Sequence, residues 1–137
     1  RSGEFALKSF LKYQFPALSW AGLIFFLSSL EKIPTFKFFL SPDKLGHSFV
    51  FLILTFLTWR AFKYQNSVQW LKDHAILFAF CVAVAYGLSD EFHQRFVPGR
   101  LFDLYDILAD AFGATLFIAV HWLFKKYSKA HQPADSK

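Results

Sequence analysis

The sequence has one cysteine, no methionine and no internal repeat. A single thiol cannot form an intramolecular disulfide, so a disulfide-stapled scaffold is excluded. Cys81 lies inside an apolar run and is expected to be a small core residue. Without repeats or low-complexity segments, a chain of 137 residues is expected to form one compact domain.

The basic residues are not arranged for binding nucleic acid. The formal net charge is +5, yet Lys and Arg flank apolar segments and form no stripe interleaved with aromatic residues. We therefore expect no nucleic-acid partner. Basic residues at the ends of apolar segments instead orient a membrane protein and contact anionic lipid.

Charge is scarce inside four long apolar segments. Hydrophobic residues make up 55% of the chain and 20 residues are Phe, whereas a soluble domain has an apolar fraction of about 45–50%. The excess is concentrated in segments that could cross a hydrocarbon layer roughly 30 Å thick. They lie at about 15–30, 45–62, 75–96 and 103–124. The sequence thus predicts an all-α, multi-pass bundle of four transmembrane helices in the plasma membrane.

Proline and glycine mark where these segments begin and end. Pro16 suits a first helical turn, and Pro42 after Ser41 is typical of a helix start. Pro98 and Gly99 predict a turn between the third and fourth segments. No small-x-small motif follows the first segment, so a cleaved signal peptide is not expected. We interpret 1–5 as a cloning remnant, 6–127 as the transmembrane domain and 128–137 as a flexible tail.

Lys and Arg are distributed unevenly around the four segments. With the N-terminus in the cytoplasm, nine basic residues beyond the remnant lie on the cytoplasmic side and five on the outer side. Cytoplasmic loops carry the excess of Lys and Arg, so both termini are predicted to be cytoplasmic. Seven of the ten acidic residues then lie at the outer face: Glu31, Asp43, Asp90, Glu91, Asp103, Asp106 and Asp110.

Polar residues at this outer face share helix faces. Asp103, Asp106 and Asp110 are spaced three and four apart, so they form one acidic stripe, which Gly113 continues. Like charges facing lipid would be costly, so the stripe is expected to face cations inside the bundle. Gly113 would let another helix pack closely. The candidate cations are Lys44, Arg95, Arg100 and protonated His47. Spacing by four also pairs Asp43 with His47, Asp90 with Gln94, and Glu91 with Arg95.

Three motifs at these helix ends are similar to those of a known family. They are Asp43-Lys44-x-x-His47, then Gly87-x-x-Asp90-Glu91-x-x-Gln94-x-Phe96-x-Pro98-Gly99-Arg100, and finally Asp103-x-x-Asp106 with a later Gly113. With them the chain resembles the VanZ-like family of small multi-helix membrane proteins over residues 15–125, most specifically over 90–106. That family is named for a member linked to teicoplanin resistance. Asp110 stands where the family usually carries Asn.

The residue types at the outer face suit a phosphate-bearing ligand. Arginine binds phosphate or carboxylate through parallel hydrogen bonds, and histidine can transfer protons. Carboxylates can orient arginines, act as a base or bind a divalent cation, here through Asp90, Glu91 and Asp106. The predicted catalytic residues are His47, Asp90, Glu91 and Asp106. The predicted ligand-binding residues are Lys44, Gln94, Arg95, Arg100, Asp103 and Asp110.

Several functions are compatible with this set of residues. The leading hypothesis is a site for a membrane lipid headgroup or a lipid-linked envelope precursor, where any reaction would be hydrolysis or transfer at a phosphoester. No serine carries a nucleophile signature, so a non-enzymatic protein that limits antibiotic access stays open. A proton-coupled transporter is disfavoured because the acids cluster at one face.

A purely structural interpretation of the same residues also stays open. Asp90 could pair with Arg95 or Arg100 only to tie a helix to a turn, and His47 could simply bond a carboxylate. The functional hypothesis makes a geometric prediction that the structural one does not require. It predicts that five side chains converge on one cavity at the outer face: His47, Asp90, Glu91, Arg100 and Asp106.

Overall fold

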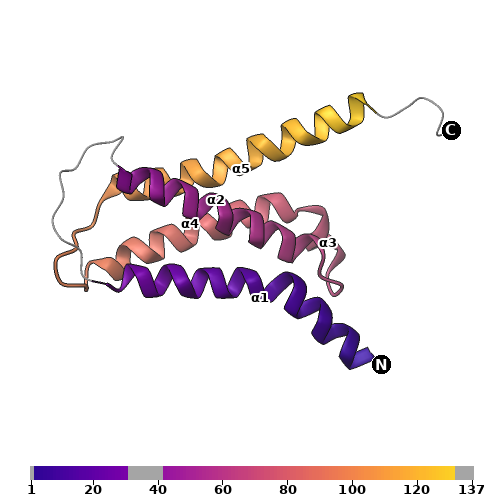
Figure 1. The fold of residues 1–137 in the computed structure, drawn as a ribbon, viewed down its shortest axis with the longest axis horizontal. Helices are drawn as coiled ribbons and strands as arrows, with labels where there is room; N and C mark the ends of the chain where they lie inside the picture. The colour runs from indigo at the N-terminus through magenta and orange to yellow at the C-terminus, as the bar shows by residue number, and fades with distance from the viewer. Residues whose placement is uncertain (1, 31–41, 132–137) are drawn as a thin grey trace.

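The computed structural model describes residues 2–30 and 42–131, and within these ranges it contains helices and no strand. The helices are α1 (Ser2–Ser28), α2 (Pro42–Lys63), α3 (Gln69–Asp73), α4 (Ala75–Gln94) and α5 (Leu104–Ala130). All except the short α3 are long and apolar enough to cross a membrane. The prediction of an all-α bundle with four membrane-spanning helices is confirmed (Figure 1).

Helix α1 begins well before the predicted segment and contains Pro16 in its interior. Good helix formers precede the proline, and an exposed ion pair joins Lys8 Nζ to Glu4 Oε1 at 2.6 Å across one turn. Proline lacks an N–H and clashes with the preceding turn, which bends a helix. Figure 1 shows the start of α1 turning away from the other helices. Pro16 therefore bends α1 instead of starting it, contrary to the sequence-based prediction.

The turn between α4 and α5 shortens both predicted helices at that end. Helix α4 ends at Gln94, two residues before the predicted end, and α5 begins at Leu104. Asp103 is not in the helix but caps it, because its Oδ1 accepts a hydrogen bond from the Tyr105 N–H at 3.0 Å. Gly99 has a φ of 76°, the left-handed conformation that glycine adopts at no steric cost.

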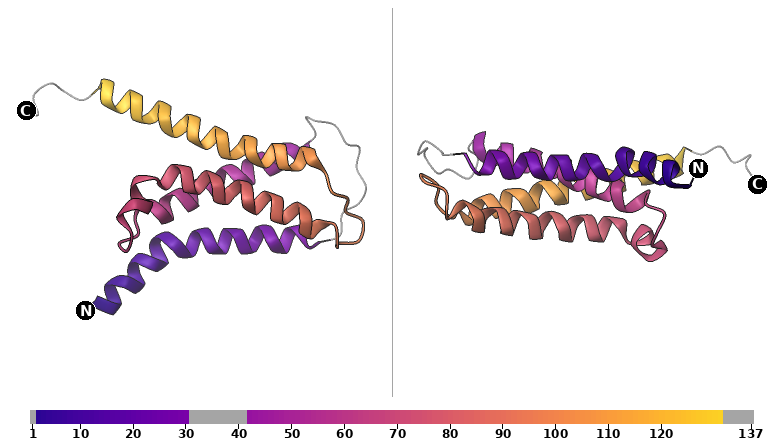
Figure 2. Two further views of the ribbon diagram at one scale, coloured as in Figure 1. Left: turned by 180° about the vertical axis from the view of Figure 1, so that it is seen from behind. Right: turned by 90° about the horizontal axis from the view of Figure 1, so that it is seen from below.

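Helix α2 is the central element and packs against α1, α4 and α5. The four long helices run alongside one another, and the start of α1 and the end of α5 lie at the same end of the bundle (Figure 1). Toward that end α5 diverges from its neighbours, as Figure 2 shows. The opposite end therefore brings together the ends of α1 and α4 with the starts of α2 and α5.

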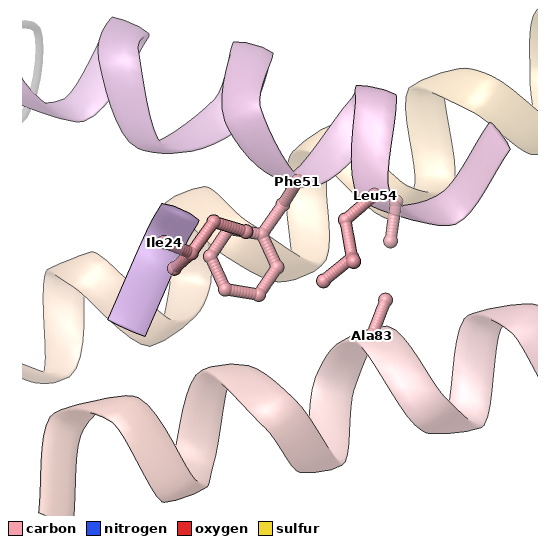
Figure 3. Close-up of a cluster of buried hydrophobic side chains, with 5 residues drawn as sticks. Ile24, Phe51, Leu54 and Ala83 are labelled. Atoms are coloured by element: carbon pink, nitrogen blue, oxygen red, sulfur yellow. The ribbon is translucent and has the colours of Figure 1, made fainter. Parts of the chain in front are cut away.

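The apolar core joins all four long helices in the middle of the bundle (Figure 3). Its buried members are Ile24, Phe51, Leu54, Ala83 and Ala114. Two hydrogen bonds from side chains to backbone carbonyls hold α1 in place, from Trp20 Nε1 to Val50 O at 3.0 Å and from Tyr86 OH to Ala21 O at 2.5 Å. Many large apolar side chains remain exposed around this core, as expected of surfaces that face lipid.

The backbones of α2 and α5 approach each other closely at Gly113. A Cβ atom on Gly113 would lie 2.0 Å from the Ser48 carbonyl oxygen, which only glycine permits. The Ser48 hydroxyl donates to the Ala109 carbonyl at 2.9 Å across the same contact. Small residues four apart that let backbones meet are typical of helix contacts in membranes. The predicted close packing at Gly113 is present.

Aromatic side chains gather at the end of the bundle where α1 starts and α5 ends. Tyr13 stacks on Tyr64 with ring centroids 4.9 Å apart, and Trp59 lies 4.7 Å from the His121 ring. Aromatic residues of this kind anchor a membrane protein at the lipid–water interface. His74 and His131 contact the carbonyls of the preceding helical turns at the same end. None of the three histidines at this end reaches the polar residues at the other end.

Candidate functional site

Buried polar side chains are concentrated at the end of the bundle formed by the α4–α5 turn. Each side chain of the acidic stripe is turned inward, and the residues Asp103, Asp106 and Asp110 are only 8%, 5% and 1% exposed. Asp106 and Asp110 lie on one face of α5, Asp103 caps the start of that helix, and α2 packs against α5. Four more polar residues in this region are also buried: Lys44, Asp90, Glu91 and Gln94.

Lys44 neutralises the start of the acidic stripe. Its Nζ lies 2.8 Å from Asp103 Oδ2 and also donates to Asp106 Oδ1, and all three side chains are buried. From the sequence, Arg95 and Arg100 were candidate partners of these acids beside Lys44. In the described residues neither arginine reaches them, because Lys44 projects from α2 directly at the face of α5 that carries the stripe.

His47, one turn further along α2, contacts the remaining acid of the stripe. Its Nδ1 lies 3.0 Å from Asp110 Oδ1, and its Nε2 lies 4.0 Å from Asp106 Oδ2. Asp110 in turn presses against Gly87 of α4, where a Cβ atom would lie 2.8 Å from Asp110 Oδ2. The carboxylate of Asp110 therefore fixes the ring of His47, and the close approach of α4 fixes Asp110.

Glu91 connects α4 to the start of α5. It is fully buried, and its Oε2 accepts a hydrogen bond from the Asp103 N–H at 2.9 Å. Its other oxygen, Oε1, has no hydrogen-bond partner among the described residues. An anion at a helix N-terminus is favourable because the first N–H groups of the helix are unpaired. Glu91 thus supports the position of Asp103, which in turn bonds Lys44.

A second chain of hydrogen bonds runs from α4 through the turn to α1. Gln94 Nε2 donates to Asp90 Oδ2 at 2.8 Å, and Arg100 Nη1 donates to Gln94 Oε1 at 3.0 Å. The guanidinium group of Arg100 also donates from Nε to Leu30 O at 3.1 Å and from Nη2 to Leu27 O at 3.2 Å. Arg100 therefore satisfies carbonyls at the end of α1 and meets Asp90 only through Gln94.

Two polar residues of the turn region lie outside this network. Arg95 is exposed, lies beside Leu101 and Phe102, and makes no ion pair with Glu91 among the described residues. His93 contacts α1 instead, with Nε2 3.0 Å from Ser29 Oγ and its ring 4.6 Å from that of Phe25. Arg95, a predicted ligand-binding residue, thus borders a surface hollow together with Arg100 but makes no contact with the buried acids among the described residues.

A cavity of about 310 Å³ opens between α1, α2 and the end of α4. Three of the five residues predicted to converge, His47, Asp90 and Arg100, line it, and Asp106 lies just behind His47. Glu91 is not among the lining residues. The complete lining consists of Ile24, Leu27, Ser28, Pro42, Asp43, Gly46, His47, Val50, Phe51, Asp90, Gln94 and Arg100.

One polar residue of this cavity, Ser28, was not predicted from the sequence. Ser28 is 5% exposed, and its hydroxyl has no hydrogen-bond partner among the described residues. The sequence did carry a signal, because Ser28 and Ser29 end an otherwise apolar segment. The cavity thus includes an unsatisfied hydroxyl from α1 in addition to the polar residues of α2.

Comparisons with known proteins agree with the motifs at these helix ends. The family model described as VanZ/LLP1 matches residues 6–125. An uncharacterized protein of Schizosaccharomyces pombe is 33% identical over 84 residues, which cover 61% of this chain and 49% of that protein. The match thus spans about half the length of the yeast relative. No solved structure matches the chain.

Proposed function

Since the chain belongs to the VanZ/LLP1 family and has four helices that can cross a bilayer, we propose that its polar cavity binds the phosphate-bearing headgroup of a membrane lipid. Family membership supports a membrane protein linked to glycopeptide resistance. The lipid headgroup as the bound ligand is our proposal and goes beyond what membership supports.

The lining of the cavity is the observation that carries this proposal. It combines apolar side chains, among them Ile24, Leu27 and Val50, with polar ones that include Asp90 and Arg100. Such a mixed lining suits an amphiphile whose headgroup meets the polar side chains while its first carbons meet the apolar ones. Because the long helices present apolar surfaces to the bilayer, a lipid could reach the cavity from the membrane.

Arg100 is the group best placed to hold the phosphate. A guanidinium group has five N–H donors, and three of those of Arg100 are engaged with Leu30, Leu27 and Gln94. Two donors are left, one on each terminal nitrogen, and the other three contacts hold the plane of the group. A pre-oriented arginine of this kind suits bidentate binding of a phosphate.

The volume of the cavity and the organism of the aligned relative favour a lipid as the ligand over a glycopeptide antibiotic or a cell-wall precursor. A cavity of about 310 Å³ is at the lower end of pockets that enclose drug-sized ligands, so a bulky glycopeptide antibiotic would not fit. The aligned relative belongs to a yeast, so a ligand shared by both proteins would be a component of both membranes. A glycerophospholipid meets that requirement better than a precursor of one kind of cell wall.

Substitution of Arg100 tests the proposed function. In protein reconstituted in nanodiscs, Arg100→Gln is expected to weaken phospholipid binding by roughly 10- to 100-fold, since hydrogen bonds to charged groups contribute about 1.5–3 kcal/mol. Binding would be measured by native mass spectrometry, and released headgroup would show whether binding leads to phosphoester cleavage. Arg95→Gln is the matched control, because Arg95 follows the same helix end but does not line the cavity. Equal losses in both variants would reject the proposal.

The orientation of the bundle gives a separate test. The excess of Lys and Arg around one end of the helices leads us to propose cytoplasmic termini and a cavity in the outer leaflet. Reporter fusions after Gln65 and at the C-terminus are expected to behave as cytoplasmic, and a fusion at Phe36, outside the described residues, as external. An external C-terminal reporter would place the cavity in the inner leaflet.

A further inference from the structure

We propose that Asp43, His47 and Asp106 bind a divalent transition-metal ion, Zn²⁺ or Mn²⁺, in the wall of the cavity. The ion site stands on its own geometry, whereas its role, to hold a phosphate oxygen of the lipid, rests on the proposed function. Asp43 and His47 come from successive turns of α2, and Asp106 comes from α5.

The three residues place their ligand atoms around one point. One carboxylate oxygen from each aspartate and one ring nitrogen of His47 all lie within 4.8 Å of one another. Bonds of about 2.0–2.2 Å from zinc to nitrogen and oxygen separate two ligands of the same ion by roughly 3–4 Å. The 4.0 Å between His47 Nε2 and Asp106 Oδ2 is too long for a hydrogen bond but suits two ligands of one ion.

Neighbouring residues already orient two of these ligands as in a metal site. Asp110 Oδ1 contacts His47 Nδ1, which leaves Nε2 as the atom facing Asp106. Lys44 bonds the other oxygen of Asp106, which leaves Oδ2 facing His47. A histidine that binds a metal through one nitrogen usually donates its other N–H to a carboxylate or carbonyl. The contact between His47 and Asp110 has this arrangement.

The charges around the proposed site favour a cation. Within the described residues, five carboxylates at this end of the bundle are less than a tenth exposed: Asp90, Glu91, Asp103, Asp106 and Asp110. Among the described residues Lys44 is the one cation buried to the same extent. The buried carboxylates therefore outnumber the buried cation, and a divalent ion would lower the cost of keeping them charged.

Ser28 is an independent indication that the cavity takes a polar ligand. Its hydroxyl is buried, belongs to α1 and not to the acidic residues, and has no partner among the described residues although it lines the same cavity as Asp43 and His47. Buried polar groups are nearly always hydrogen-bonded. A water or phosphate oxygen on the ion would supply the missing partner.

The ligand set indicates which ion would bind. Imidazole favours zinc and other transition metals, whereas magnesium and calcium prefer oxygen ligands alone. Three protein ligands leave at least one position open for a water or a phosphate oxygen. The phosphate would then lie between the ion and the two remaining donors of Arg100 across the cavity. This places positive charge on both sides of the lipid phosphate.

Metal titration of the purified full-length chain tests this inference. Protein in detergent, stripped with a chelator, would be titrated with Zn²⁺ by calorimetry and with Mn²⁺ by electron paramagnetic resonance. We expect one ion per chain and a loss of about tenfold or more in affinity for His47→Gln and for Asp43→Asn. His93→Gln is the matched control, because His93 lies at the same end of the bundle but contacts Ser29. Because Asp43 is not fully buried, Asp43→Asn keeps the test usable if His47→Gln does not fold.

The outcomes separate this inference from the proposed function. No ion binding by the parent protein, or an equal loss in His93→Gln, would overturn the metal site while phospholipid binding through Arg100 could still be observed. Ion binding without any phospholipid binding would support the metal site and reject the proposed function. Phospholipid binding that is unchanged after chelation would overturn the bridging role of the ion, and at least tenfold weaker binding would support it.

Discussion

Lys44→Met is expected to destabilise the protein by about 3–5 kcal/mol, the cost of removing one partner from a buried ion pair. Lys44 bonds both Asp103 and Asp106, and none of the three side chains is more than 9% exposed. Methionine fills a similar volume but leaves two carboxylates facing each other without a cation. The free energy of unfolding would be measured by SDS titration in mixed micelles, with helicity followed by circular dichroism.

Two further variants make this result specific to the buried charge. Lys63→Met removes an exposed lysine at the other end of α2 and is expected to change stability by no more than about 0.5 kcal/mol. Adding Asp103→Asn and Asp106→Asn to Lys44→Met removes the unpaired charges and should recover much of the loss. A Lys44→Met protein as stable as the parent would show that the lysine is not needed to neutralise the stripe.

Gly113→Ala is expected to cost about 3 kcal/mol or more, at the upper end of what overpacking a core costs. The new Cβ atom would lie 2.0 Å from the carbonyl oxygen and 2.8 Å from the carbonyl carbon of Ser48. These are backbone atoms, so no side-chain rotation relieves the clash, and α2 and α5 must separate. The same SDS titration measures the effect, and loss of the Ser48–Ala109 hydrogen bond should accompany it.

Gly22→Ala is the control for the glycine substitution. Gly22 lies in α1, and a Cβ atom there would meet nothing within 4 Å. Alanine has the higher helix propensity, so stability should be unchanged or rise by up to about 1 kcal/mol. Equal losses at Gly22 and Gly113 would mean that the loss reflects helix propensity in detergent and not the contact between α2 and α5.

Helical spacing predicted those features of the site that lie within one helix. Asp106 and Asp110 are buried on the same face of α5, and Gln94 bonds Asp90 four residues earlier. Both follow from the period of the α-helix, which the sequence displays directly. The four membrane-spanning helices were predictable for a similar reason, because length and hydropathy are local properties.

Contacts between helices could not be predicted in the same way. Which cation meets Asp106 depends on how α2 and α5 are rotated and shifted along each other, so the sequence left four candidates: Lys44, Arg95, Arg100 and protonated His47. Arg95 also falls just beyond the end of α4, so the spacing that would pair it with Glu91 does not apply. The burial of the unsatisfied Ser28 hydroxyl depends on how α1 packs against the other helices, so the sequence alone could not predict it.

The helices differ in length, and only one end of the bundle ties them together. Helices α1 and α5 have 27 residues each, whereas α4 has 20, so at 1.5 Å per residue they differ by roughly 10 Å. Polar contacts hold all four long helices together around Lys44 and Arg100, so the surplus length extends from the opposite end, where Figure 1 shows α1 and α5 spreading apart. We therefore expect hydrophobic mismatch in thin or thick membranes to be absorbed by tilting of these free ends. The polar end would keep its geometry, and one protein could serve membranes of different lipid composition.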